Sequence, residues 1–173
     1  ALAGLKKLVF LSLAECGGLC DISPLSELDG LEEIRLSGCE NLCEHGVLNG
    51  VLNLKRLDLD RCACLRDVCF LSGLKGLEQV CLSGCESLED ISALSGLANL
   101  TCLNLDGCLL VRDLAALSGL RELKKLSLCG CAALTDISPL SGLSNLTVLQ
   151  LDSCKFLRGL PDLSGLKRME VLS

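Results

Sequence analysis

The stretch "LTCLNLDGC", residues 100–108, decides the fold of this chain. Leu100, Leu103 and Leu105 are separated by polar or small residues, and a single asparagine stands between the last two. Alternation of this kind is typical of a short strand with one buried and one exposed face. Cys108 follows three residues after the last leucine. The stretch therefore predicts a strand and then an inward turn that carries a cysteine.

The same pattern returns every 23 residues, with no insertion, over nearly the whole chain. The repeat units start at Leu8, Leu31, Leu54, Leu77, Leu100, Leu123, Leu146 and Met169. Eight positions after the first seven starts stand the column cysteines Cys16, Cys39, Cys62, Cys85, Cys108, Cys131 and Cys154. A fixed period of this length indicates a solenoid in which each unit forms one coil and packs against its neighbours.

The repeat L-x-x-L-x-L-x-x-C resembles that of leucine-rich repeat proteins. This resemblance implies an α/β solenoid shaped as a horseshoe, with a parallel sheet on the concave side and short 3₁₀ or turn segments on the convex side. The longer phrase "LxLSGCxxLxDISPLSGLxxL" resembles the Cys-containing repeats of trypanosomatid proteins. "DISPL", at residues 21–25 and 136–140, is also similar to internalin repeats. Internalin repeats usually have 22 residues and an asparagine in the cysteine column.

The return path from one strand to the next is short. Ser23-Pro24 and Ser138-Pro139 each place a serine, which we expect to act as N-cap, before a proline suited to the first helical position. Glycine recurs after such starts, at Gly96, Gly119 and Gly142 among others, where a short helical turn would end. The spacing predicts a 3₁₀ segment or a single helical turn on the convex side.

We expect residues 1–173 to form one leucine-rich repeat domain that is a slice of a longer array. The opening "ALAGLKK" matches the tail of a repeat, "ALSGLAN" at residues 93–99, and residues 169–173 begin another strand. Terminal repeats usually carry polar caps. End-to-end association through uncapped ends is therefore one alternative function.

The column cysteines are predicted to be buried, unpaired thiols. Neighbouring members would lie about 4.8 Å apart with parallel side chains, so the torsion of about 90° of a disulfide would be hard to reach. Free thiols favour a reducing compartment, which predicts an intracellular protein, cytoplasmic or nuclear. Cys81, Cys102 and Cys129 fall at outward strand positions, where we expect them to be exposed.

A metal or redox protein is a second alternative, centred on Cys20, Cys43 and His45. Cys20 and Cys43 share one column in adjacent repeats, and cysteine and histidine can bind zinc. No second paired motif accompanies them, and no basic cluster is present to lower a thiol pKa. We therefore predict no metal and no cofactor.

The composition of the chain argues against several classes of function. The net charge of −6 disfavours nucleic-acid and anionic-membrane partners, and no apolar run reaches membrane-spanning length. The chain has one histidine and lacks phosphate-loop, G-x-S-x-G and H-E-x-x-H motifs. We predict that it is not an enzyme and has no catalytic residues.

The working surface is predicted to be the concave sheet, which carries both signs of charge and suits a protein partner. Its candidate binding residues are Glu33, Arg35, Arg56, Asp58, Asp60, Gln79, Asn104, Asp106, Lys125, Gln150 and Asp152. Asp60, Asp106 and Asp152 recur every 46 residues and would form a file with gaps of about 10 Å, two strand spacings each. The sequence thus predicts a non-enzymatic scaffold for protein–protein interaction.

Overall fold

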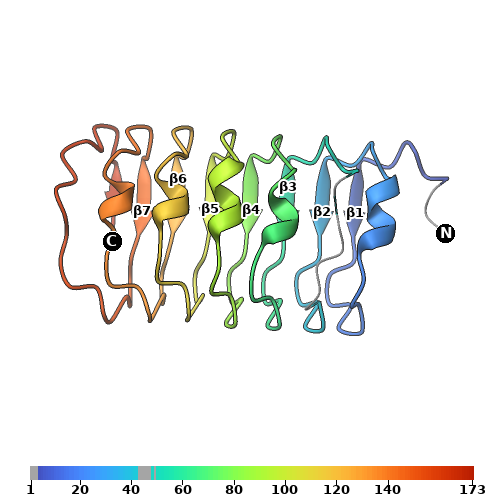
Figure 1. Ribbon diagram of the computed structural model, residues 1–173, viewed down its shortest axis with the longest axis horizontal. Coiled ribbons are helices and arrows are strands. Elements are labelled where there is room, and N and C mark those ends of the chain that lie inside the picture. Colours follow the sequence, from blue (N-terminus) through green and yellow to red (C-terminus); the bar gives the residue numbers. More distant parts are fainter. Residues whose placement is uncertain (1–3, 43–47, 49) are drawn as a thin grey trace.

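The computed structural model describes residues 4–42, 48 and 50–173, and its coils stack side by side along one axis (Figure 1). Eight short strands form one parallel sheet in chain order, so each strand pairs with the strands of the coils next to it. The strands are β1 (Phe10–Ser12), β2 (Glu33–Arg35), β3 (Arg56–Asp58), β4 (Gln79–Cys81), β5 (Cys102–Asn104), β6 (Lys125–Ser127), β7 (Val148–Gln150) and β8 (Val171–Leu172).

The register of the sheet follows the 23-residue period. Leu103 of β5 pairs with Val80 of β4 on one side and with Leu126 of β6 on the other. These central side chains are at most 2% exposed, while the residues before and after them in each strand are half-buried or exposed. The alternation expected from the sequence is confirmed for β2 to β7, with the central residue of each strand in the core and its neighbours on what we call the sheet face.

Five 3₁₀ segments lie on the opposite side of the coils, which we call the helical face; in Figure 1 they stand in front of the strands. They are η1 (Ser23–Glu27), η2 (Cys69–Leu71), η3 (Ser92–Gly96), η4 (Ala115–Leu117) and η5 (Ser138–Leu140). The expected short 3₁₀ connection is confirmed. A 23-residue coil leaves no room for a longer helix once the strand and its turns are formed.

The caps of these segments differ from the sequence-based expectation. Ser23 and Ser138 are the first residues of η1 and η5, and neither segment has a side-chain hydrogen bond at the residue before it. The cap is an aspartate two residues earlier: Asp136 Oδ1 accepts from the Ser138 N–H at 2.8 Å. The same contact, to the N–H two residues on, is made by Asp21, Asp67, Asp90, Asp113 and Asp162.

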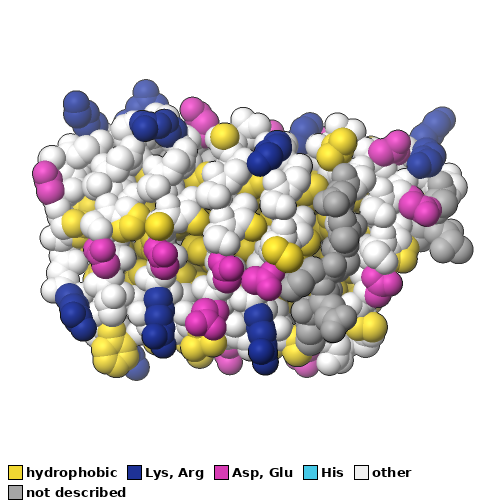
Figure 2. Space-filling model, in the orientation of Figure 1, with side chains coloured by type: hydrophobic (Ala, Val, Ile, Leu, Met, Phe, Trp, Pro, Cys, Tyr) yellow, Lys and Arg dark blue, Asp and Glu magenta, His cyan; other side chains and the backbone are white. Residues whose placement is uncertain are grey.

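These aspartates belong to the helical face, where acidic side chains form a row (Figure 2). The short loop that Asp21, Asp67, Asp90, Asp113 or Asp136 closes satisfies a backbone N–H at the start of a 3₁₀ segment, whereas Asp162 closes a loop that no 3₁₀ segment follows. Hydrogen bonds from Ser138 lower the pKa of the Asp136 carboxyl from its ordinary value of 3.8. The row is therefore first of all a set of caps.

The core is one continuous stack of leucine layers. Each complete coil contributes residues from its strand, its turns and its 3₁₀ segment, and most of these side chains are fully buried. No polar or charged residue within the described part of the chain is fully buried. Phe70 is the one aromatic residue of this core, because leucine side chains fill most of each layer.

The turn after each strand requires left-handed backbone. Gly107 has φ 68° and its N–H donates to Cys129 O of the next coil at 2.7 Å, which extends the ladder past the strand. Gly38 has φ 71°, and an added Cβ there would lie 2.6 Å from a Glu15 carboxylate oxygen. That carboxylate is paired with Arg61, which stands 46 residues further on.

Truncation of a core leucine should destabilise the stack strongly. Leu126 is 1% exposed at the centre of β6, so Leu126→Ala should lower the free energy of unfolding by about 2–5 kcal/mol through lost burial and an unfilled cavity. Leu52→Ala is the control, since Leu52 is 65% exposed. Guanidinium unfolding followed by circular dichroism measures both, and equal losses would contradict the layered core.

The aspartate caps should make stability depend on pH in the acid range. Because the pKa of Asp136 is lowered on folding, its contribution is present above pH 3.8 and is lost as the pH falls through the folded-state pKa. The wild-type protein should thus be more stable than Asp136→Ala at pH 6, and the difference should shrink below pH 4. Thermal unfolding of the two proteins between pH 2 and 6 tests this. A difference that stays constant over that range would exclude the cap as its source.

Candidate functional site

The column cysteines are built into the contact between coils. Cys39, Cys62, Cys85, Cys108 and Cys131 are fully buried. Each of these thiols, and that of Cys154, donates to the carbonyl oxygen 26 residues earlier, in the coil before it, at 3.1–3.3 Å. The expected structural role is confirmed for these six, because a thiol is small, apolar and able to donate one weak hydrogen bond.

Two column cysteines depart from the expected burial. Cys16 is exposed, and Cys154 is half-buried. Within the described residues, no carbonyl of a preceding coil accepts from the Cys16 thiol. Cys154 has that carbonyl, but the coil that follows it departs from the repeat at "RGLPD", residues 158–162.

Burial also sets the chemistry of these thiols. It raises the pKa of Cys62, Cys85 and Cys131 to about 12, and that of Cys108 upward as well, because the thiolate would lose its hydration. A protonated, enclosed thiol is a poor nucleophile. The 13 cysteines within the described residues are all free.

The outward cysteines are less exposed than expected. Cys81, Cys102 and Cys129 are half-buried, and Cys81 and Cys102 line a hollow on the sheet face. Burial is the main cause that raises the pKa of all three, to about 12 for Cys81, whose thiol also lies beside the Asp60 carboxylate. A redox thiol needs a lowered pKa, so these positions are unsuited to that role.

The metal alternative depends on residues that the structure does not describe. Cys43 and His45 lie outside the described residues, and Cys20 is an exposed, free thiol. Within residues 4–42, 48 and 50–173, no three His, Cys, Asp or Glu side chains are arranged to hold a metal ion. Over the same residues, no helix is long and apolar enough to cross a membrane.

The sheet face has two outward columns with different properties. The first residue of each strand forms the more open column, in which Arg56, Gln79 and Lys125 are exposed. The last residue of each strand forms the second column, which is mostly half-buried. Arg56, Gln79 and Lys125 of the open column, together with exposed Arg35 of the second column, are therefore the side chains that a partner can reach most easily.

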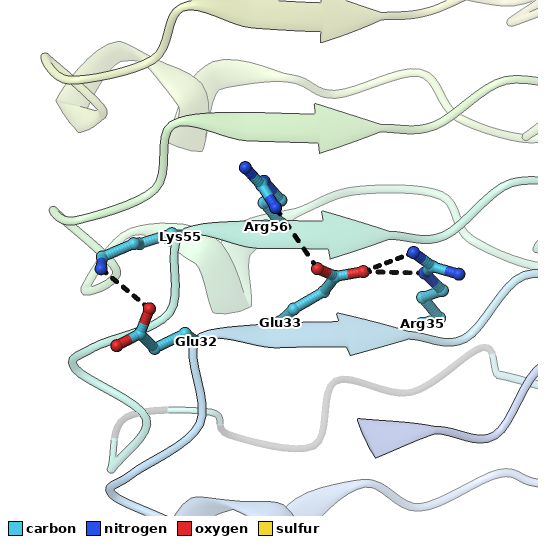
Figure 3. A network of polar contacts seen from close by, with 5 residues as sticks. All are labelled: Glu32, Glu33, Arg35, Lys55 and Arg56. Carbon is cyan, nitrogen blue, oxygen red and sulfur yellow. Dashed lines mark hydrogen bonds and ion pairs between the residues drawn. The ribbon is translucent and has the colours of Figure 1, made fainter. Parts of the chain in front are cut away.

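A charged network lies at the N-terminal end of this face (Figure 3). The Glu33 carboxylate, whose side chain is 22% exposed, pairs with Arg35 at 2.7 Å and with Arg56 at 3.6 Å. The Arg35 guanidinium lies 5.2 Å from the centre of the Phe10 ring. Beside them Lys55 pairs with Glu32 at 2.8 Å. Exposed pairs of this kind contribute only about 0–1 kcal/mol to folding, so their main effect is to hold two guanidinium groups in place.

The network borders a hollow of about 360 Å³ that spans β2 to β5. We call it the sheet-face hollow; its polar lining consists of Glu33, Arg35, Arg56, Asp58, Gln79 and Asn104. Cys81 and Cys102 lie on its floor. The hollow thus brings together six of the predicted binding residues from four coils.

Several predicted binding residues are engaged in bonds within and between coils instead. Asp60 Oδ1 accepts from the Ser83 N–H at 2.9 Å, and Asp106 Oδ1 accepts from the Cys129 N–H at 2.7 Å. Asp58 and Asn104 each accept from the N–H two residues on. These side chains link the end of one strand to its turn and to the next coil. The alternation of apolar and polar residues continues past the strand into the turn. It therefore does not distinguish outward side chains that bond to the backbone from those that are free to bind a partner.

The last two predicted residues lie near the C-terminal end of the face. Gln150 is half-buried at the end of β7, and the Asp152 carboxylate accepts from the Ser173 hydroxyl at 2.7 Å. The file of Asp60, Asp106 and Asp152 is therefore not a set of free carboxylates. It is a recurring link to the following coil.

Comparison with known proteins supports the fold. No family model and no curated protein sequence matches the chain. Among solved structures, the leucine-rich repeat domain of the type III effector XopL has a TM-score of 0.68 at 21% identity, over 98% of this chain and 70% of that one. Internalin C2 of Listeria monocytogenes has a TM-score of 0.60 at 21% identity, over 100% and 83%.

A second internalin, InlF of the same organism, has a TM-score of 0.52 at 22% identity. The match covers 88% of this chain but only 56% of InlF. At such identities the likeness shows the fold alone, and the fold is that of a leucine-rich repeat solenoid. The resemblance to trypanosomatid repeats stays a prediction.

The burial of the column thiols predicts strong differences in reactivity. At pH 8, a thiol with a pKa of about 12, such as Cys85, has roughly one thiolate in 10⁴ molecules and no access to solvent, so it should resist iodoacetamide while exposed Cys20 reacts. Peptide mapping by mass spectrometry after a timed reaction measures both sites. In guanidinium both should react alike, and native labelling of Cys85 at the rate of Cys20 would contradict the burial.

Proposed function

We propose that this protein is a non-enzymatic scaffold that binds a protein partner through its sheet face. The observation that carries the proposal is the open column of Arg56, Gln79 and Lys125, three exposed side chains of different chemistry held in register beside the sheet-face hollow. Rigid strands fix the spacing of these groups, which favours specific recognition of a folded surface. The leucine-rich repeat folds of the neighbours agree with an interaction role in general.

The charges of the face favour a protein over other partners. The two guanidinium groups held by Glu33 are partly neutralised by it, so the local field is mixed rather than strongly positive. A mixed field steers and selects a protein surface, whereas nucleic acid and anionic membranes need a basic patch that this chain of net charge −6 lacks. Arg56 and Lys125 are the residues we expect to contribute most to selectivity.

The free thiols support a reducing, intracellular location for this scaffold. End-to-end association of the array is a separate proposal that came from the sequence, and sedimentation velocity over a range of concentrations tests it. A profile that stays monomeric would exclude such association. The sheet-face proposal does not depend on that outcome.

Charge reversal on the open column should abolish partner binding without unfolding the protein. Arg56→Glu combined with Lys125→Glu changes two exposed side chains. In the described structure neither of them donates a hydrogen bond to the backbone of another coil. The partner captured by the wild-type chain from cell extract, once purified, should bind this double variant at least tenfold more weakly in calorimetry.

The matched control is Arg121→Glu combined with Lys167→Glu. It makes the same change in net charge at exposed positions outside the strands. This control should keep full affinity, and circular dichroism should show both variants folded. Equal binding by the sheet-face variant, or equal loss in the control, would move the site away from the sheet face.

A further inference from the structure

A second surface lies where the chain leaves the strands and turns toward the helical face. The two positions after each column cysteine are exposed or half-buried in most coils. In the first four coils they hold small or polar residues, namely Gly17-Gly18, Glu40-Asn41, Ala63-Cys64 and Glu86-Ser87. In the next three they hold Leu109-Leu110, Ala132-Ala133 and Lys155-Phe156. The large apolar side chains at these positions, Leu109, Leu110 and Phe156, thus lie in the coils of β5 and β7, on either side of the two alanines.

These apolar side chains form one hollow of about 550 Å³. We call it the edge hollow; its apolar lining consists of Leu109, Leu110, Ala132, Ala133 and Phe156. Ala133 N–H donates to Leu109 O at 3.2 Å, so the leucine coil and the alanine coil are in direct contact. The two alanines form a low floor between the leucines on one side and Phe156 on the other.

The repeat itself does not require this surface. Leu109 and Leu110 are 40% and 41% exposed although complete coils lie on both sides of them, so their exposure does not depend on where the chain ends. The same positions in earlier coils hold small or polar residues, and the stack is formed equally well there. Exposed apolar side chains gathered in one hollow are a mark of a binding surface.

Two arginines border the edge hollow. Arg112 and Arg158 lie in its lining on either side of Thr135, in the column of residues four positions after each column cysteine. Arg112 and Arg158 are two coils apart, so their backbones lie about 10 Å from each other. Neither side chain makes an ion pair within residues 4–42, 48 and 50–173. An apolar floor with two unpaired guanidinium groups at its border is complementary to an apolar group flanked by carboxylates.

We propose that the edge hollow binds an acidic, apolar peptide segment of a partner protein, at a site separate from the sheet face. The segment places a bulky apolar side chain over Ala132 and Ala133 and presents two carboxylates to Arg112 and Arg158. A spacing of about 10 Å corresponds to seven residues in a helix or three in an extended segment. A nucleic acid is a poorer fit, because the floor is aliphatic and Phe156 is the one ring available for stacking.

Selection from a random 12-residue peptide library displayed on phage, with the intact chain as target, tests the proposal. The enriched peptides should combine at least one large apolar residue with two or more aspartates or glutamates. A synthetic peptide of the enriched sequence should bind in fluorescence anisotropy, and its affinity should fall with added salt. Failure to enrich any sequence, or enrichment of basic sequences, would overturn the proposal.

Variants locate the binding. Arg112→Glu combined with Arg158→Glu, and Leu109→Ser combined with Leu110→Ser, should each weaken the peptide at least tenfold. Arg66→Glu is the control for a single charge reversal in this column, since Arg66 holds the same column in a coil outside the hollow and is exposed, and it should leave the affinity unchanged. Binding that survives both double variants, or that is lost with Arg66→Glu, would contradict the assigned site.

The sheet-face variant separates this proposal from the proposed function. Arg56→Glu combined with Lys125→Glu should bind the peptide as the wild-type chain does, because neither residue lines the edge hollow. Loss of peptide binding in that variant would mean that the peptide occupies the sheet face and would overturn the second site. Retained binding supports two separate surfaces, whatever the outcome of partner capture at the sheet face.

Discussion

The contact between one coil and the coil before it is the interaction on which the whole structure depends. It has the same two parts at every step: the parallel strand ladder on the sheet face and the thiol that donates to a carbonyl 26 residues earlier. Both parts require that the chain return to the same place after 23 residues. The period therefore tolerates no insertion between Leu8 and Met169, and a cysteine suits the buried turn because a larger side chain would separate the coils.

Because the interior is nearly the same in every coil, the surface residues can differ from coil to coil. Leucine layers are nearly interchangeable from coil to coil, whereas the outward positions of β2 to β6 differ at every step. Part of that outward chemistry is structural, since Asp60, Asp106 and the capping aspartates satisfy backbone N–H groups. The open column of the sheet face and the edge hollow are not used for such backbone contacts, and these are the surfaces to which we assign binding.

The sequence predicts the interior well and the surface less well, for physical reasons. Spacing alone placed the strands, the 3₁₀ segments and the buried thiols, because burial leaves few choices of residue at those positions. It could not separate Asp60, which holds the next coil, from Arg56, which is exposed, since both fall on the outward side of the same alternation. Asp67, Asp90, Asp113 and Asp136 follow the period, but a recurring exposed aspartate looks the same in the sequence whether it caps a 3₁₀ segment or only contacts solvent. The edge hollow depends on the register of the coils, which places Leu110, Ala133 and Phe156 side by side although they are far apart in the sequence.

Because each element pairs only with its neighbours in chain order, distance along the solenoid is proportional to the number of coils. The sheet-face hollow spans β2 to β5, and the edge hollow begins in the coil of β5. Because both hollows include residues of that coil, insertion of one 23-residue unit between Asn104 and Leu109 would move the two surfaces apart by one strand spacing, about 4.8 Å. The number of coils between two surfaces therefore sets how far apart two bound molecules are held, independently of what each surface recognises.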